Sequence, residues 1–126
     1  MAKRRIEVTE YELAVLQVLW REGSATIRRI TEAIYGQHTT AAYATVQKLL
    51  ERLAAKKCVR RDRSSFAHTY QATVAQGDLI AHRLDALAEE LCSGSLTPLL
   101  MHLVERVDLS AAERAALRRL IDDAAD

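Results

Sequence analysis

Apolar residues in the first third of the chain recur every three or four positions, which predicts two short amphipathic helices. Thr9 and Glu12 have the spacing of a capping box at the start of the first helix, and Gly23 ends that helix. Thr26 can cap the second helix, which ends near Gly36. The apolar positions expected to face the core are Leu13, Val15, Leu16, Leu19, Trp20, Ile27, Ile30 and Ile34.

A third amphipathic helix is predicted from Thr40 to about Lys57, with Thr39 or Thr40 as its cap. Its inward face consists of four apolar residues, Val46, Leu49, Leu50 and Leu53. Two helices joined by a short turn that contains glycine form a helix-turn-helix unit, in which the later helix reads the DNA groove. The third helix is therefore the candidate for DNA recognition.

After the third helix the apolar period changes from helical to alternating, which predicts a basic β-hairpin over residues 59–70. Ser64 and Ser65 mark its turn. Its return strand is expected to place three residues on one face, Phe66, His68 and Tyr70. A two-stranded hairpin is unstable alone in water, so it has to lean on the helices, with Val59 and Tyr70 as the expected contacts. The first domain is expected to end near Thr73.

The apolar pattern of residues 74–126 predicts three leucine-rich helices. The second has Pro98 in its first turn, and the third begins with a capping box of Ser110 and Glu113. So small a unit cannot bury this many leucines by itself. We expect a second copy of the chain to cover them, and the alternative is that the helices fold back on the N-terminal domain. The residues expected at the interface are Ile80, Leu84, Leu87, Leu91, Leu96, Leu99, Leu100, Leu103, Val104, Leu117, Leu120 and Ile121.

The formal net charge of +1 hides an uneven distribution. Residues 1–72 contain 13 Lys and Arg against 7 Asp and Glu, whereas residues 73–126 contain 5 against 10. A basic half is expected where a polyanion docks, and an acidic half is poorly suited to that role. Unevenly distributed solvated charge is the plain alternative, so the placement of the charges has to decide.

The outward face of the third helix has residues suited to a DNA major groove about 12 Å wide. Ala41 and Ala44 keep the helix thin and can meet thymine methyl groups. Thr45 and Gln47 can hydrogen-bond base edges, and Lys48 can reach a guanine or a phosphate. Alanine, threonine and glutamine are also ordinary helix surface, so the hairpin next to the helix favours the DNA interpretation.

Basic residues are concentrated between positions 48 and 63. Of these, Arg63, with Ser64 and Ser65 at the turn, is best placed to hold phosphates, whereas Lys56 and Lys57 can simply complement a helix dipole. The full set expected to contact DNA is Arg28, Thr40, Ala41, Tyr43, Ala44, Thr45, Gln47, Lys48, Arg52, Arg63, Ser64, Ser65 and His68.

Other kinds of function have little support in the sequence. Cys58 and Cys92 stand far apart, and the histidines His38, His68, His82 and His102 lack ligand spacing, so we expect no metal or other cofactor. The chain has no glycine-rich phosphate loop and no convincing nucleophile–base pair, which argues against an enzyme. No apolar run approaches the ~20 residues of a membrane span, and no secretory signal is evident. We therefore expect a cytoplasmic protein that does not bind membranes.

Four segments carry a resemblance to a known family. They are Glu10-x-x-Leu13-x-x-Leu16-x-x-Leu19-Trp20, Ala25-Thr26-Ile27-Arg28, Ala42-Tyr43-Ala44-Thr45-Val46-x-x-Leu49-Leu50-x-x-Leu53 and Ala67-His68-x-Tyr70. Together they resemble the penicillinase-repressor family, which comprises the BlaI and MecI repressors of β-lactam resistance and the related CopY copper-responsive repressors. The resemblance implies a homodimer of winged helices that occupies both halves of a dyad operator and blocks transcription. It also implies a membrane sensor protease, encoded in the same operon, as a partner.

The chain departs from the family pattern at several positions. Ala44 stands where the family usually has a second threonine, and Lys57 stands where a glycine normally closes the helix. The cysteine cluster of the copper-responsive members is absent. Some relatives are inactivated by cleavage of an Asn-Phe bond, where this chain has Met101-His102-Leu103. The operator sequence and the inducing signal therefore do not carry over.

The sequence thus predicts a mainly α protein with a small β-hairpin wing. Residues 1–73 form a winged helix-turn-helix DNA-binding domain, and residues 74–126 form a helical dimerisation domain. The predicted function is that of a dimeric, sequence-specific transcriptional repressor. The alternatives are a winged-helix module that binds an acidic protein, and a thiol- or metal-responsive regulator working through Cys58 or Cys92.

Overall fold

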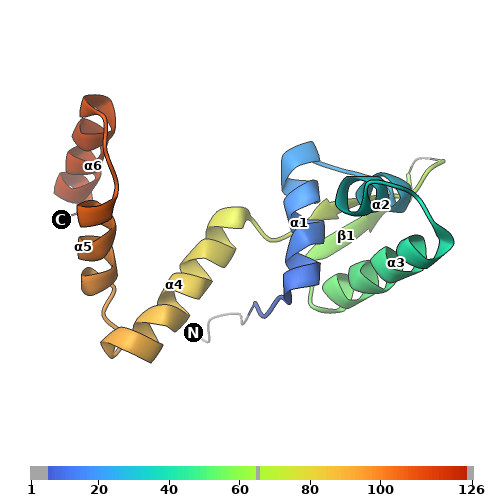
Figure 1. Ribbon diagram of the computed structural model, residues 1–126, viewed down its shortest axis with the longest axis horizontal. Coiled ribbons are helices and arrows are strands. Elements are labelled where there is room, and N and C mark those ends of the chain that lie inside the picture. Colours follow the sequence, from blue (N-terminus) through green and yellow to red (C-terminus); the bar gives the residue numbers. More distant parts are fainter. Residues whose placement is uncertain (1–5, 65, 125–126) are drawn as a thin grey trace. The chain divides into compact units, whose positions relative to one another are not determined.

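The helices and strands follow one another in the order that the sequence predicts. The computed structural model describes residues 6–64 and 66–124, which contain six helices and one two-stranded antiparallel sheet (Figure 1). The elements are α1 (Glu10–Glu22), α2 (Ile27–Tyr35), α3 (Thr40–Ala55), β1 (Val59–Asp62), β2 (Thr69–Ala72), α4 (Gln76–Cys92), α5 (Thr97–Arg106) and α6 (Ala111–Ala124). The prediction of a mainly α fold with a β-hairpin wing is confirmed.

Threonine side chains begin the first three helices, as predicted. Thr9 Oγ1 accepts from the Glu12 amide at 3.2 Å, while Glu12 Oε1 accepts from the Thr9 amide at 2.8 Å, which completes the capping box of α1. Thr26 caps α2, and Thr39 rather than Thr40 caps α3. Each cap satisfies an amide that has no partner within its helix, so the sequence fixes where these helices start.

The end of α3 is closed by a lysine in a conformation that favours glycine. Lys57 has φ 62°, and its amide donates to the Ala54 carbonyl at 3.0 Å. The next amide, of Cys58, donates to the Leu53 carbonyl at 2.8 Å, which completes a Schellman motif. The turn therefore has the shape that a glycine would give it, at the cost of placing a side chain in the left-handed region. The regular helix ends at Ala55, slightly before the predicted end.

One hydrophobic core holds the first three helices and the hairpin together. It includes the predicted inward residues of α3, and Val74 and Leu79 extend it beyond the hairpin into the start of α4. Trp20 packs at its edge and donates from Nε1 to the Val74 carbonyl at 2.8 Å. Thr31 is also fully buried, and its hydroxyl is satisfied there because it donates to the Ile27 carbonyl at 2.7 Å. The core therefore fixes the positions of α2, α3 and the hairpin relative to one another.

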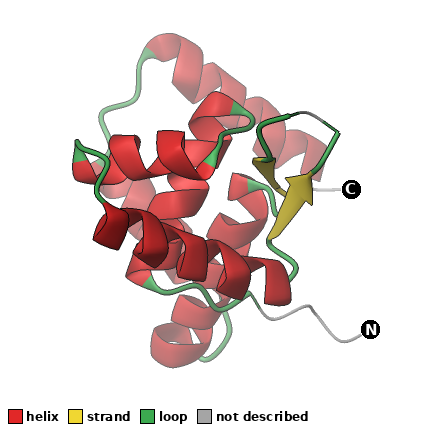
Figure 2. Ribbon diagram, turned by 90° about the vertical axis from the view of Figure 1, so that its right-hand side faces the viewer, coloured by secondary structure: helices red, strands yellow, loops and turns green. Residues whose placement is uncertain are grey.

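The return strand of the hairpin starts and ends later than predicted, and the hairpin is anchored by an additional backbone contact. β1 and β2 pair with Val59 opposite Ala72, and Figure 2 shows them as adjacent antiparallel arrows. β2 begins only at Thr69, so placing Phe66 and His68 on a strand face was wrong, and the Phe66 side chain is fully exposed. The predicted core contacts of Val59 and Tyr70 are confirmed.

The additional contact is made by Ala25, in the link between α1 and α2. Its amide and carbonyl both pair with the backbone of Tyr70, at 3.1 and 2.8 Å. This bridge holds the return strand of the wing against the start of α2, so the wing does not depend on side-chain packing alone.

The chain divides into two compact units, residues 1–83 and 84–126. In the second unit, Pro98 lies in the first turn of α5, and Ser110 and Glu113 form the predicted capping box of α6. Of the twelve predicted interface residues, ten are exposed, and only Leu99 and Leu117 are half-buried. None of the helices in the described part of the chain is long and apolar enough to cross a membrane. The division of roles between a DNA-binding and a dimerising domain stays a prediction.

Candidate nucleic-acid interface

The two sides of α3 differ as the sequence predicts. Val46, Leu49, Leu50 and Leu53 are buried. The opposite side is exposed and contains the predicted contacts Thr40, Ala41, Ala44, Thr45, Gln47, Lys48 and Arg52. The exposed side chains are short or uncharged near the N-terminus, and further along they include the basic Lys48 and Arg52 beside the acidic Glu51. Such a surface fits a groove with the N-terminal half of the helix and reaches phosphates with the other half.

Local hydrogen bonds limit what two of these side chains can offer. The Thr45 hydroxyl donates to the Ala41 carbonyl at 3.0 Å, so its oxygen is left to accept and its methyl group is left for apolar contact. Tyr43 is half-buried, and its ring meets the His38 ring edge-on with the centroids 5.4 Å apart. Both contacts hold the side chains in place before any ligand arrives.

The wing tip is exposed and basic. Arg63 and Ser64 both lie in the loop between the strands and are exposed, whereas Ser65 lies outside the described residues. Asp62 turns the chain here, because its Oδ1 accepts from the Ser64 amide at 2.8 Å. Hydrogen bonds from Ser64 also lower the pKa of the Asp62 carboxyl, so this carboxylate is already engaged at the turn. Arg63 is thus presented to solvent beside a structured turn.

One of the predicted basic positions, Arg28, has a partner that competes with phosphate. Arg28 forms an ion pair with Glu32, with Nε 3.3 Å from Oε1, on an exposed face of α2. Exposed pairs of this kind contribute little energy, so Arg28 can exchange Glu32 for a phosphate at small cost.

Lys56 has a structural role that the sequence did not indicate. Its Nζ lies 2.6 Å from Oε1 of Glu12, whose side chain is fully buried, and 2.8 Å from the Glu7 carbonyl oxygen. Burial raises the pKa of Glu12, but hydrogen bonds from Lys56 and Thr9 outweigh that effect and leave the pKa lowered. Lys56 therefore neutralises a buried carboxylate and is not available to DNA.

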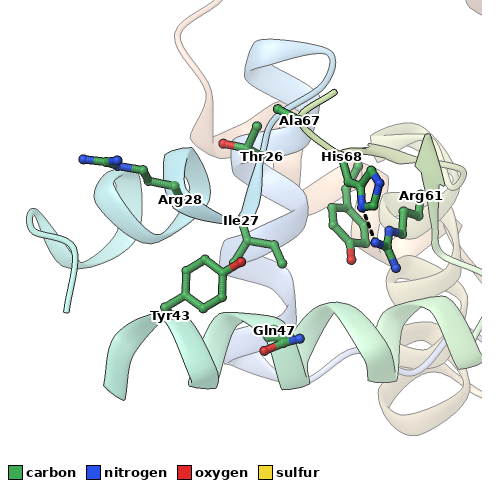
Figure 3. A pocket seen from close by; sticks show the side chains of 9 residues that line it. Thr26, Ile27, Arg28, Tyr43, Gln47, Arg61, Ala67 and His68 are labelled. Atoms are coloured by element: carbon green, nitrogen blue, oxygen red, sulfur yellow. Dashed lines mark hydrogen bonds between the residues drawn. The ribbon is translucent and has the colours of Figure 1, made fainter. Parts of the chain in front are cut away.

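A cleft opens between α2, α3 and the wing (Figure 3). Its volume is about 290 Å³. The residues that line it are Thr26, Ile27, Arg28, Tyr43, Gln47, Arg61, Ala67, His68 and Tyr70. Four of these, Arg28, Tyr43, Gln47 and His68, belong to the predicted DNA-binding set, and the structure brings them together from three elements. The other predicted contacts that the structure describes on α3 and the wing are not among these lining residues.

Arg61 is the charged cleft residue that the predicted DNA-binding set left out. Its guanidinium hydrogen-bonds Nδ1 of His68 across the hairpin (Figure 3). Arg60, next to it, instead donates to Oε1 of Gln71 at 2.9 Å. Strand alternation sends neighbouring side chains to opposite faces, and this was the signal that could have separated Arg61 from Arg60.

The remaining chemistry is sparse. Cys58 is buried in the core, so a thiol response there would require the core to open. Within residues 6–64 and 66–124, no three His, Cys, Asp or Glu side chains are grouped so that they could hold a metal ion.

A helix-turn-helix with a basic antiparallel wing beside its second helix defines a winged-helix DNA-binding protein. The family model for the penicillinase repressor matches residues 8–123. The transcriptional regulator BlaI of Mycobacterium tuberculosis is 40% identical over 114 residues, which cover 89% of this chain and 80% of that protein. The penicillinase repressor of Staphylococcus aureus is 21% identical, with 98% and 97% of the two chains covered. The methicillin resistance regulatory protein MecI of the same species is 24% identical, with 97% and 98% covered.

The chain therefore belongs to the penicillinase repressor family, and the predicted resemblance is confirmed. The names of the relatives describe regulators and repressors of transcription, which agrees with the prediction that this chain is a repressor and not an enzyme.

Proposed function

We propose that this protein is a cytoplasmic transcriptional repressor that binds an operator with dyad symmetry as a homodimer. The observation that carries the proposal is the exposed side of α3. Thr40, Ala44 and Gln47 expose a narrow surface of small and polar side chains, while the same helix buries four apolar residues on its other side. A helix that is fixed in a core and leaves this surface uncovered is suited to reading base edges.

The C-terminal helices support the homodimer. Leu91 and Leu120 are 68% and 65% exposed, and they belong to a set of large apolar residues on α4, α5 and α6. Contiguous exposed apolar surface marks an interaction site, and a second copy of the chain would cover the same residues on both partners. Two α3 helices joined in this way would contact DNA half-sites that lie about one helical turn of DNA apart, or a multiple of it. The membrane sensor protease stays a prediction of the resemblance.

The proposal is tested by fluorescence anisotropy with DNA from upstream of the protein's own gene. We expect Lys48→Ala combined with Arg63→Ala to weaken binding about 10- to 100-fold and to reduce the slope of the salt dependence, because both cations face DNA. Arg106→Ala combined with Arg119→Ala removes the same charge from α5 and α6 and should leave the affinity nearly unchanged.

Two results would contradict the proposal. One is equal binding of the upstream DNA and of a shuffled sequence. The other is an equal loss of affinity in both double variants, because net charge and not α3 and the wing would then govern binding.

A further inference from the structure

The cleft between α2, α3 and the wing has the chemistry of an anion site. Its lining includes four residues whose side chains can donate hydrogen bonds, Thr26, Tyr43, Gln47 and Arg61, and no Asp or Glu is among the lining residues. Hydrogen-bond donors without an opposing carboxylate favour a negatively charged guest.

Two arginines line this cleft, Arg28 and Arg61, and Arg61 is the better placed to bind an anion. In Figure 3 Arg61 and His68 face each other, whereas the guanidinium of Arg28 points away from them. Arg28 is also paired with Glu32, while no carboxylate of the described residues pairs with Arg61. A guanidinium has five N–H donors, so the hydrogen bond to His68 leaves most of them available for phosphate oxygens.

His68 restricts the orientation of Arg61. It lies directly before β2, and Arg61 lies on β1, so their hydrogen bond joins the two sides of the hairpin. The rotamer freedom of a long side chain is costly to lose upon binding, and an arginine already held in position loses less.

We propose that this cleft seats one phosphate of the DNA backbone, with Arg61 as the residue that binds it and His68 as the residue that positions Arg61. The inference rests on the proposed function. Because Tyr43 and Gln47 of α3 line the same cleft, a phosphate there fixes how deeply α3 enters the groove. The same phosphate chemistry could come from a free phosphorylated compound, and the experiment separates the two sources.

The test combines Arg61→Gln with DNA duplexes that have one neutral methylphosphonate at each backbone position in turn. Wild-type protein should lose about 10-fold in affinity when the neutral group replaces the phosphate that enters the cleft, once in each half-site, and Arg61→Gln should lose about the same on unmodified DNA. At that position the two losses should not add, because each removes the same contact. Arg60→Gln is the matched control, since Arg60 is its neighbour on β1 but pairs with Gln71, and it should keep the wild-type profile.

The positioning role is tested at His68. His68→Leu should weaken binding several-fold, and His68→Asn should restore affinity because an amide oxygen can accept from Arg61. In the Arg61→Gln background neither substitution should matter. Arg61 and His68 are both exposed, so the variants are expected to fold, and Trp20 fluorescence checks this.

Three outcomes would overturn the inference while leaving the proposed function intact. The Arg61→Gln loss could add to the methylphosphonate loss at every position, or Arg60→Gln could match Arg61→Gln. The third outcome combines two results. The affinity losses of Arg61→Gln and of the methylphosphonates add at every position, and the NMR chemical shifts of His68 change on titration with inorganic phosphate. This outcome would assign the cleft to a free phosphate compound. Failure of the wild-type protein to prefer its upstream DNA would instead overturn the proposed function itself.

Discussion

The two units of this protein treat the same residue type in opposite ways. In residues 1–83, Leu16 and Leu53 are completely buried, because α1, α2, α3 and the hairpin surround them. In residues 84–126, Leu103 is 53% exposed, although it also lies within an α-helix. A segment can thus form a helix without burying the apolar side chains of that helix. The first unit covers its apolar surface with its own elements, and the second unit leaves such a surface uncovered.

Charge is also distributed unevenly between two parts of the chain. The basic excess lies before residue 73, in the part that contains α3 and the wing, and the acidic excess lies from residue 73 onward. Phosphates attract the first half and repel the second, so the charges favour DNA contact by one half only. The leucines of the acidic half are then left for an apolar contact such as self-association.

The largest expected effect comes from shortening a buried leucine in the first unit. Leu16→Ala should lower the free energy of unfolding by about 2 to 5 kcal/mol, because it leaves a cavity in a core that cannot fully collapse. Urea unfolding monitored by the fluorescence of Trp20, the only tryptophan, measures the change.

The counterpart in the second unit is Leu103→Asp. We expect it to leave the Trp20 environment intact, to yield monomers in sedimentation and to weaken operator binding strongly. Leu103→Met keeps an apolar surface and should remain dimeric. The comparison between the units fails if Leu103→Asp stays dimeric or changes the Trp20 spectrum as much as Leu16→Ala does.

A smaller effect is expected from the ion pair that joins α1 to the end of α3. Lys56→Met leaves the Glu12 carboxylate buried without its cation and should cost about 2 to 4 kcal/mol of stability near pH 7. The pKa of Glu12 is lowered in the folded protein. At pH values above the ordinary pKa of glutamate, the ion pair therefore stabilises the fold. This stabilisation is lost as the pH falls through the lowered pKa.

The destabilisation by Lys56→Met should therefore shrink when urea unfolding is repeated under progressively more acidic conditions. Lys48→Met removes a lysine from the exposed side of the same helix and serves as the control. An equal loss of stability at every pH would contradict the role assigned to Lys56.

The smallest expected effect concerns the turn after α3. Lys57→Gly should stabilise the protein by about 0.5 to 1 kcal/mol relative to Lys57→Ala, because both remove the side chain but only glycine relieves the strain of φ 62°. Thermal unfolding of the two variants measures the difference. Equal stability would show that the backbone here is not strained.

Local signals made most of the first unit predictable. Each helix cap at Thr9, Thr26 and Thr39 is made with an amide three residues away, and the alternation of buried and exposed positions in α3 follows from the helical period. The extent of the wing was less predictable. Phe66 and His68 alternate with Tyr70 as strand residues would, yet β2 starts only at Thr69, because strand ends depend on backbone pairing that alternation does not encode.

The sequence alone indicates which segments are helices, where they begin and which side of α3 faces the core. It also indicates that the C-terminal leucines exceed what three short helices can bury. Which partners meet across the fold could be seen only in the folded structure. Ala25 pairs with Tyr70, Lys56 with Glu12 and Arg61 with His68. The physical reason is distance along the chain. Caps and amphipathic faces form among residues a few positions apart, whereas these contacts exist only after the core has brought separate elements together.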